Sequence, residues 1–79
     1  YSQHMQGQAV DIISPTLEPK QIFEILYKST YPVKQVILYA PSEGNFVHIS
    51  IDPERPPKRQ FLIKESGAFS PYNGGSIIL

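Results

Sequence analysis

The sequence predicts an α+β fold in which a small antiparallel sheet packs against one helix. Three observations support this prediction. Several short runs are rich in β-branched residues, one run has apolar residues at helical spacing, and a loop containing Gly and Asn separates two of the β-branched runs. The chain has 79 residues, which is the size of one small domain. We therefore treat residues 1–79 as a single domain.

The first strand is expected at residues 8–13. Its side chains alternate weakly, with Val10 and Ile12 on one side and Asp11 on the other. The sequence SPTLEP that follows has the composition of a turn. The chain should therefore reverse direction before the next element.

One helix is expected at residues 19–29. Pro19 suits the first turn of a helix, where its missing N–H is not needed. Four apolar residues recur at helical spacing: Ile22, Phe23, Ile25 and Leu26. The residue before Pro32 is disfavoured in the helical conformation, so the helix should end before that point.

The sequences VKQVILYA and FVHISID are expected to form an antiparallel hairpin, because PSEGN between them contains the Gly and Asn that hairpin loops favour. If Tyr39 and Phe46 close a six-residue loop, Ile37 lies opposite His48. Polar and aromatic residues then share the face of His48: Gln35, Tyr39 and Ser50.

The last third of the chain is expected to contain one more strand. ERPPK predicts a rigid extended loop, RQFLIK a short strand and ESG a turn. We expect the final segment, AFSPYNGGSIIL, to be a partly ordered tail.

Composition excludes several classes of partner. Seven basic and seven acidic residues give a formal net charge of zero, which argues against nucleic acid as a partner. The sequence RPPKR at residues 55–59 is a local basic cluster, and we interpret it as a solvated loop. No apolar run approaches the roughly 20 residues that cross a bilayer, so membrane insertion is not expected.

His4, Asp11 and His48 are candidate ligands of one metal ion. The chain has no Cys, so a transition-metal site must use His, Asp or Glu. An unbroken strand would put His4 roughly 23 Å from Asp11, but a bend at Gly7 brings the two closer. Two imidazoles and one carboxylate, with water as the fourth ligand, form the ligand set of a catalytic zinc site. Taken singly, each histidine also suits a hydrogen-bonded or surface role, and Asp11 a turn-capping role.

The pattern SxHxxGxAxDI, followed by FVHIS, resembles the zinc peptidases of the D-alanyl-D-alanine carboxypeptidase and L-alanyl-D-glutamate endopeptidase group, relatives of the hedgehog-type metal fold. The first motif has six matching positions: Ser2, His4, Gly7, Ala9, Asp11 and Ile12. QVILY and DPERPPKRQFLI are similar to phage-encoded members, so the resemblance covers nearly the whole chain. It implies that His4, Asp11 and His48 bind Zn²⁺, that an antiparallel sheet carries the site, and that bacterial cell-wall peptide is the substrate.

The sequence departs from that family at the general base, which relatives place near the second ligand histidine. Asn45 stands three residues before His48, and Lys34 and Tyr39 stand where phage-type relatives have acids. The amide of Asn45 cannot take a proton from water. Glu43 is the nearest remaining carboxylate, and Asp52 lies just beyond the strand. Neither stands where the family pattern puts its base, and we assign the catalytic base to Glu43.

The resemblance also predicts how much of the family's domain this chain contains. The upstream part of the usual domain, which in relatives carries a substrate-binding arginine, is not in this chain. We therefore expect residues 1–79 to be the C-terminal part of a zinc peptidase domain, with an upstream polypeptide segment or other virion proteins as partners.

Three interpretations follow. The first is a zinc-dependent peptidase that hydrolyses peptidoglycan stem peptides, as a phage lysin or virion protein acting on the bacterial cell wall from the periplasm or the cell exterior. In it, Tyr39 is either a donor to the developing oxyanion or an ordinary cross-strand aromatic. The second is a catalytically inactive structural or wall-binding module of a phage particle, in which zinc serves folding alone. The third is an unrelated small α+β domain whose histidines only satisfy hydrogen bonds.

Overall fold

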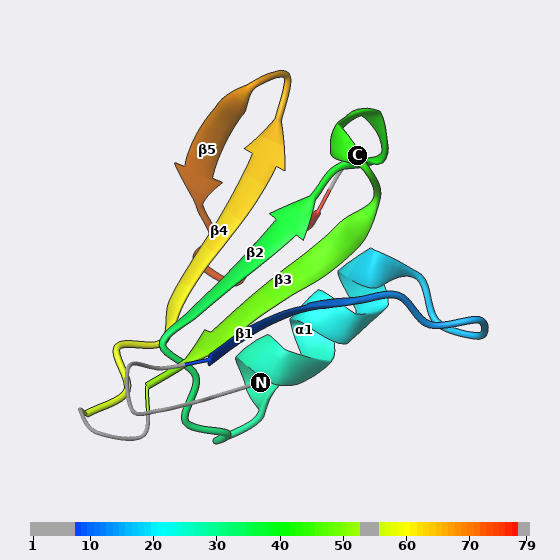
Figure 1. Cartoon of the computed structure of the whole chain (residues 1–79). Helices are drawn as coiled ribbons and strands as arrows, with labels where there is room; N and C mark the ends of the chain where they lie inside the picture. The colour runs from blue at the N-terminus through cyan, green and yellow to red at the C-terminus, as the bar shows by residue number, and fades with distance from the viewer. Residues whose placement is uncertain (1–7, 53–55, 78–79) are drawn as a thin grey trace.

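The computed structural model describes residues 8–52 and 56–77 of the chain. It is a small α+β fold in which a five-stranded sheet carries one helix on one face (Figure 1). The elements in chain order are β1 (Gln8–Ile12), α1 (Pro19–Lys28), β2 (Gln35–Tyr39), the 3₁₀ turn η1 (Pro41–Glu43), β3 (Phe46–Ile51), β4 (Gln60–Glu65) and β5 (Ala68–Pro71). The predicted fold class is therefore confirmed.

Helix α1 forms where its sequence pattern predicts. Pro19 is its first residue, and the side-chain oxygen of Gln21 accepts a hydrogen bond of 2.8 Å from the backbone N–H of Glu18, the N-cap residue. This contact satisfies one backbone group at the start of the helix. Phe23 is fully buried against the sheet, whereas Ile25 is exposed. The helix thus has one buried face, as its apolar spacing predicts. Within the described part of the chain, no helix is long and apolar enough to cross a membrane.

The hairpin of β2 and β3 has the predicted register. The strands are antiparallel, Tyr39 pairs with Phe46, and Ile37 pairs with His48. The connecting loop turns at Gly44 and Asn45, which both have positive φ angles, of 118° and 59°. Gly tolerates this conformation at no steric cost, and Asn is one of the residues that adopt it most readily.

Strand β1 lies beside β3 and not beside the strand that follows it along the chain. The strand order is β1-β3-β2-β4-β5, and β1 and β3 are antiparallel. Because β1 and β2 occupy the two edges of β3, β4 pairs with the remaining edge of β2. That pairing is parallel, so the sheet is mixed, whereas the sequence predicts an antiparallel sheet.

The expectation of a partly ordered tail is wrong for its first residues. Residues Ala68–Pro71 form the edge strand β5, antiparallel to β4. A tight turn at Ser66 and Gly67 joins the two strands, and both residues have positive φ. All four residues of β5 are exposed, which explains why their hydrophobic pattern does not indicate a strand.

The core lies between α1 and one face of the sheet. It consists of Phe23, Val33, Val36, Leu38, Val47, Ile49 and Phe61. The rings of Tyr27 and Tyr72 extend it, because Phe23 and Tyr27 each make edge-to-face contacts with Phe61 and Tyr72, at centroid distances of 4.8–5.5 Å. Such pairs stabilise a core beyond the area that they bury.

The other face of the sheet is not covered by α1. Figure 1 is seen from this side, so that β1 and β3 pass in front of the helix. We call it the open face. Strand alternation and pairing register place on it the residues Ala9, Asp11, Gln35, Ile37, Tyr39, Phe46, His48, Ser50, Gln60, Leu62, Lys64 and Phe69.

Candidate metal centre

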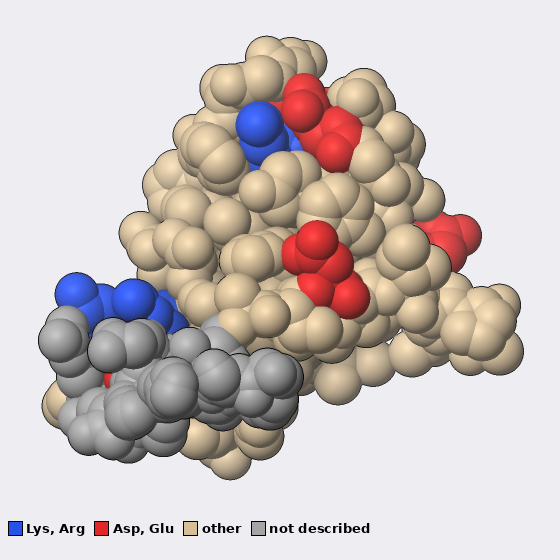
Figure 2. Space-filling model, viewed as in Figure 1, with Lys and Arg blue, Asp and Glu red and all other residues tan. Residues whose placement is uncertain are grey.

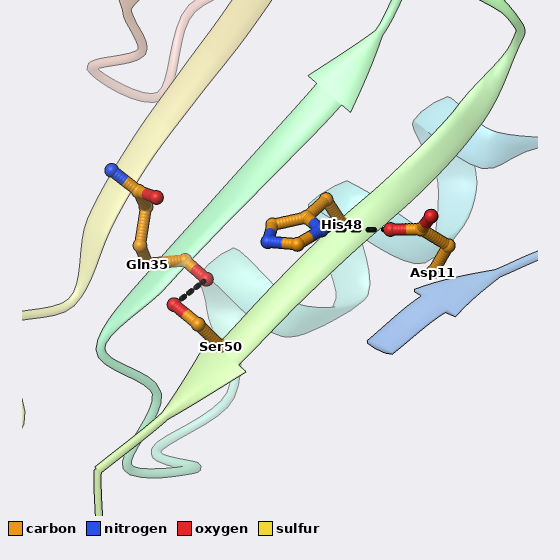
Figure 3. A network of polar contacts seen from close by, with 4 residues as sticks. All are labelled: Asp11, Gln35, His48 and Ser50. Atoms are coloured by element: carbon orange, nitrogen blue, oxygen red, sulfur yellow. Dashed lines mark hydrogen bonds and ion pairs between the residues drawn. The ribbon is translucent and has the colours of Figure 1, made fainter. Parts of the chain in front are cut away.

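Asp11 and His48 meet on the open face. They are direct cross-strand partners in the β1·β3 pair, although they are 37 positions apart in sequence. The Nδ1 atom of His48 lies 2.7 Å from the Oδ1 atom of Asp11, and Figure 3 shows the two side chains pointing toward each other. An ionised carboxylate only accepts hydrogen bonds, so the imidazole Nδ1–H donates. Folding thus brings together two of the three predicted ligands.

The local sequence explains why both side chains leave the core. Val10 and Ile12 of β1 pair with Ile49 and Val47 of β3 on the helix side of the sheet. Because side chains alternate along a strand, Asp11 must then point to the open face, and so must His48. The Asp11 side chain is 59% exposed and that of His48 is 30% exposed. The pair is therefore accessible to an ion or a substrate.

The distance between the two side chains is compatible with a shared zinc ion. Two tetrahedral ligands that bind zinc at about 2.0–2.2 Å lie roughly 3.4 Å from each other. The observed separation of Nδ1 and Oδ1 is 2.7 Å. Small side-chain rotations that open the pair by roughly 0.7 Å would make room for the ion, which takes the place of the shared proton. These two residues therefore fit the chemistry of a zinc site.

The third predicted ligand, His4, lies outside the described residues. Within residues 8–52 and 56–77 there is no group of three or more His, Cys, Asp or Glu side chains able to hold a metal ion. The ligand role of His4 therefore stays a prediction. A complete zinc site would need a third side chain to reach the pair formed by Asp11 and His48.

A second group of polar contacts lies further along the open face. Ser50, two residues further along β3, donates a long hydrogen bond of 3.5 Å to the backbone carbonyl of Gln35 (Figure 3). The side-chain amide of Gln35 in turn donates to the side-chain oxygen of Gln60, at 2.8 Å. These contacts connect β3, β2 and β4, so the floor of the site is a braced surface of three strands.

Glu43, the predicted catalytic base, is engaged at another place in the structure. It ends the η1 turn, and its Oε2 atom accepts a hydrogen bond of 2.7 Å from the backbone N–H of Gly67, in the turn between β4 and β5. Its Oε1 atom lies 3.9 Å from the ammonium of Lys64. The carboxylate therefore attaches the hairpin loop to β4 and β5. Its role as base stays a prediction.

Asn45 lies on the other side of the sheet. It lines two hollows beside the start of α1, which it shares with Glu18 and Pro19. The left-handed conformation of Asn45 and its position at the end of the loop direct the residue toward the helix. The position from which relatives supply a base is thus turned away from the face that carries His48.

Tyr39 stacks on Phe46, its partner across the hairpin. The ring centroids are 4.4 Å apart and the ring planes differ by 10°. This is the cross-strand aromatic pair that the sequence offers as one interpretation of Tyr39. Donation to an oxyanion stays a prediction.

Sequence reasoning missed the contribution of β4 to this face. Gln60, Leu62 and Lys64 lie on the open face because β4 pairs in parallel with β2. The alternation in QFLIK was a usable signal for which residues share a face. It could not show which edge β4 would join.

Comparison with models of protein families, with curated proteins and with solved structures finds no match to this chain.

Proposed function

We propose that the protein is a zinc-dependent peptidase that hydrolyses peptidoglycan stem peptides. The observation that carries the proposal is the pairing of Asp11 with His48, two residues of the motifs that resemble zinc peptidases, at 2.7 Å on the open face. In this function Zn²⁺ supplies Lewis-acid chemistry and an activated water. The protein acts on the bacterial cell wall as a lytic enzyme or as part of a phage particle.

The residues of this chain orient the imidazole of His48 and leave the site accessible to a peptide. The hydrogen bond from His48 to Asp11 fixes the orientation of the imidazole before a metal arrives. The open face leaves an extended peptide room to lie across β3, β2 and β4. We assign the proton transfer to the carboxylate of Glu43. This carboxylate must break its hydrogen bond with the N–H of Gly67 to reach a substrate above His48.

Metal analysis together with a peptidase assay tests the proposal. The purified protein should hold about one zinc per chain and release alanine or a shorter peptide from a synthetic stem peptide. His48→Ala should lose both zinc and hydrolysis, because it removes a ligand. Lys20→Ala, at an exposed position on α1, is the control and should keep both. A wild-type protein without zinc and without hydrolysis would refute the proposal.

A second candidate function is a structural or wall-binding module that keeps the metal but not catalysis. The observation in its favour is that the Glu43 carboxylate is held by the N–H of Gly67 at 2.7 Å. Glu43→Gln separates the two functions when assayed beside the wild type. If the wild type hydrolyses the stem peptide and Glu43→Gln does not, the result supports Glu43 as the base. Equal hydrolysis by both assigns the base to another group, and zinc binding without hydrolysis by the wild type supports the structural module.

A further inference from the structure

The open face carries one cation at some distance from the candidate metal centre. Lys64 is the only Lys or Arg that strand alternation places on this face within β1 to β5 as the structure describes them. Its ammonium lies 5.7 Å from the centroid of the Tyr39 ring and 5.2 Å from that of Phe69. Two aromatic rings thus hold the charge in place, and the side chain is 27% exposed.

The ammonium of Lys64 keeps capacity for an anionic ligand. Its distance to the Oε1 atom of Glu43 is 3.9 Å, which is too long for a hydrogen bond. Glu43 makes its shorter contact, 2.7 Å, with the N–H of Gly67. An ammonium has three donors, so a carboxylate from outside could bind it without displacing Glu43 from Gly67.

The surface between Lys64 and His48 is apolar. Ile37 pairs with His48 on one side and with Leu62 on the other. Lys64 pairs with Tyr39, two residues further along, so the line from His48 to Lys64 crosses β2 between Ile37 and Tyr39, and Leu62 lies beside Lys64. Ile37 is only 7% exposed although it faces away from α1. In Figure 2, which shows this face, the upper basic atoms lie beside acidic atoms, and one further acidic group lies near the centre among mostly uncharged atoms.

The spacing suits a short peptide. Neighbouring strands lie about 4.8 Å apart and a strand rises about 3.3 Å per residue, so the Cα atoms of His48 and Lys64 are roughly 12 Å apart. An extended peptide advances about 3.3–3.6 Å per residue. A carboxylate bound at Lys64 would therefore lie about three residues from a carbonyl placed beside His48. Small apolar side chains would rest on Ile37 and Leu62.

We propose that Lys64 is a specificity residue that binds a carboxylate of the peptide substrate about three residues from the bond that is cut. This inference rests on the proposed peptidase function. Stem peptides offer carboxylates of two kinds, on glutamate and at the C-terminus. Both have the chemistry that an ammonium between two rings recognises.

The experiment compares three forms of one synthetic stem peptide of L-alanine, D-glutamate, L-lysine and D-alanine: the free acid, the glutamate amide and the C-terminal amide. Lys64→Met removes the charge and keeps an unbranched side chain. The matched control is Lys20→Met, which makes the same change in net charge at an exposed position on α1. We expect Lys64→Met to lower kcat/KM for the free acid about tenfold relative to the wild type. The amide that lacks the bound carboxylate should be cleaved with the same kcat/KM by the wild type and by Lys64→Met. The amide that shows this behaviour identifies the source of the carboxylate.

Two outcomes would overturn the inference and leave the peptidase proposal standing. One is an equal loss of activity by Lys64→Met on all three peptides, which indicates a structural role. The other is equal kcat/KM of the wild type on all three. If the wild type cleaves none of them, the peptidase proposal fails, and the affinities of the same peptides, measured by calorimetry, decide the role of Lys64. Equal Kd values for the acid and both amides would then refute it.

Discussion

Arg59 offers the sharpest test of how this small fold is held together. Its guanidinium donates hydrogen bonds to the carbonyls of Leu26, Tyr27 and Ser29, at 3.2, 3.2 and 2.9 Å, and also to that of Tyr31. These carbonyls lie at and just beyond the C-terminal end of α1, where the helix leaves its last acceptors unsatisfied. One side chain, from the residue before β4, therefore ties the helix to the sheet. The solvated-loop interpretation of the basic cluster is wrong for Arg59.

The expected loss of stability follows from these contacts. A hydrogen bond that involves a charged group contributes roughly 1.5–3 kcal/mol, and contributions within one network are not additive. Water can replace part of the loss, because these carbonyls are only partly buried. We expect Arg59→Met to lower the free energy of unfolding by about 3 kcal/mol, a large part of the roughly 4–12 kcal/mol that a domain of this size has. Tm should fall by about 12–24 °C.

Urea denaturation followed by circular dichroism measures this loss. Arg59→Met keeps a Cβ atom at a position with a φ of 51°, so backbone strain is similar in both proteins. The free energy of unfolding of Arg59→Lys should lie between those of the wild type and Arg59→Met, because a single ammonium cannot reach all the carbonyls at once. The exposed neighbour Lys58 provides the control variant, Lys58→Met, which should unfold like the wild type. If Arg59→Met and Lys58→Met have the same midpoint and slope, the argument from the helix terminus is refuted.

Three further predictions concern the loop, the core and the site. Gly44→Ala should destabilise the protein by about 2 kcal/mol or more, because the residue has a φ of 118° and a Cβ would lie 2.7 Å from the Phe46 ring. Gly67→Ala, with nothing within 4 Å of its Cβ, should lose only about 1 kcal/mol in the same denaturation assay. Phe23→Ala should cost about 3–5 kcal/mol, and a loss below 1 kcal/mol would contradict its place at the centre of the core. Asn45→Asp should leave kcat on stem peptide within about twofold of the wild type, because the residue lies on the helix side of the sheet; a large gain would show that it reaches the site.

Much of the local structure was predictable from the sequence. The apolar spacing after Pro19 specified the helix, and the loop between Tyr39 and Phe46 specified the hairpin and its register. Both depend on residues close together in the chain, where turn chemistry and periodicity act directly. The face on which His48 lies followed from the same register.

The candidate site was predictable only in part. Sequence patterns singled out Asp11 and His48 but could not show that β1 would align with β3 so that the two residues become neighbours. The position of Glu43 was also hidden, because its partner Gly67 belongs to a turn that exists only when β5 pairs with β4.

The sequence by itself determined α1 and strands β1 to β4, the hairpin at the centre of the sheet and the residue types available for a metal. Only the tertiary structure decided the strand order, the parallel pairing of β2 with β4 and the meeting of Asp11 with His48. The physical reason is that turns and periodic apolar patterns act over a few residues, whereas strand order depends on which edges remain unpaired once the apolar face is buried against α1.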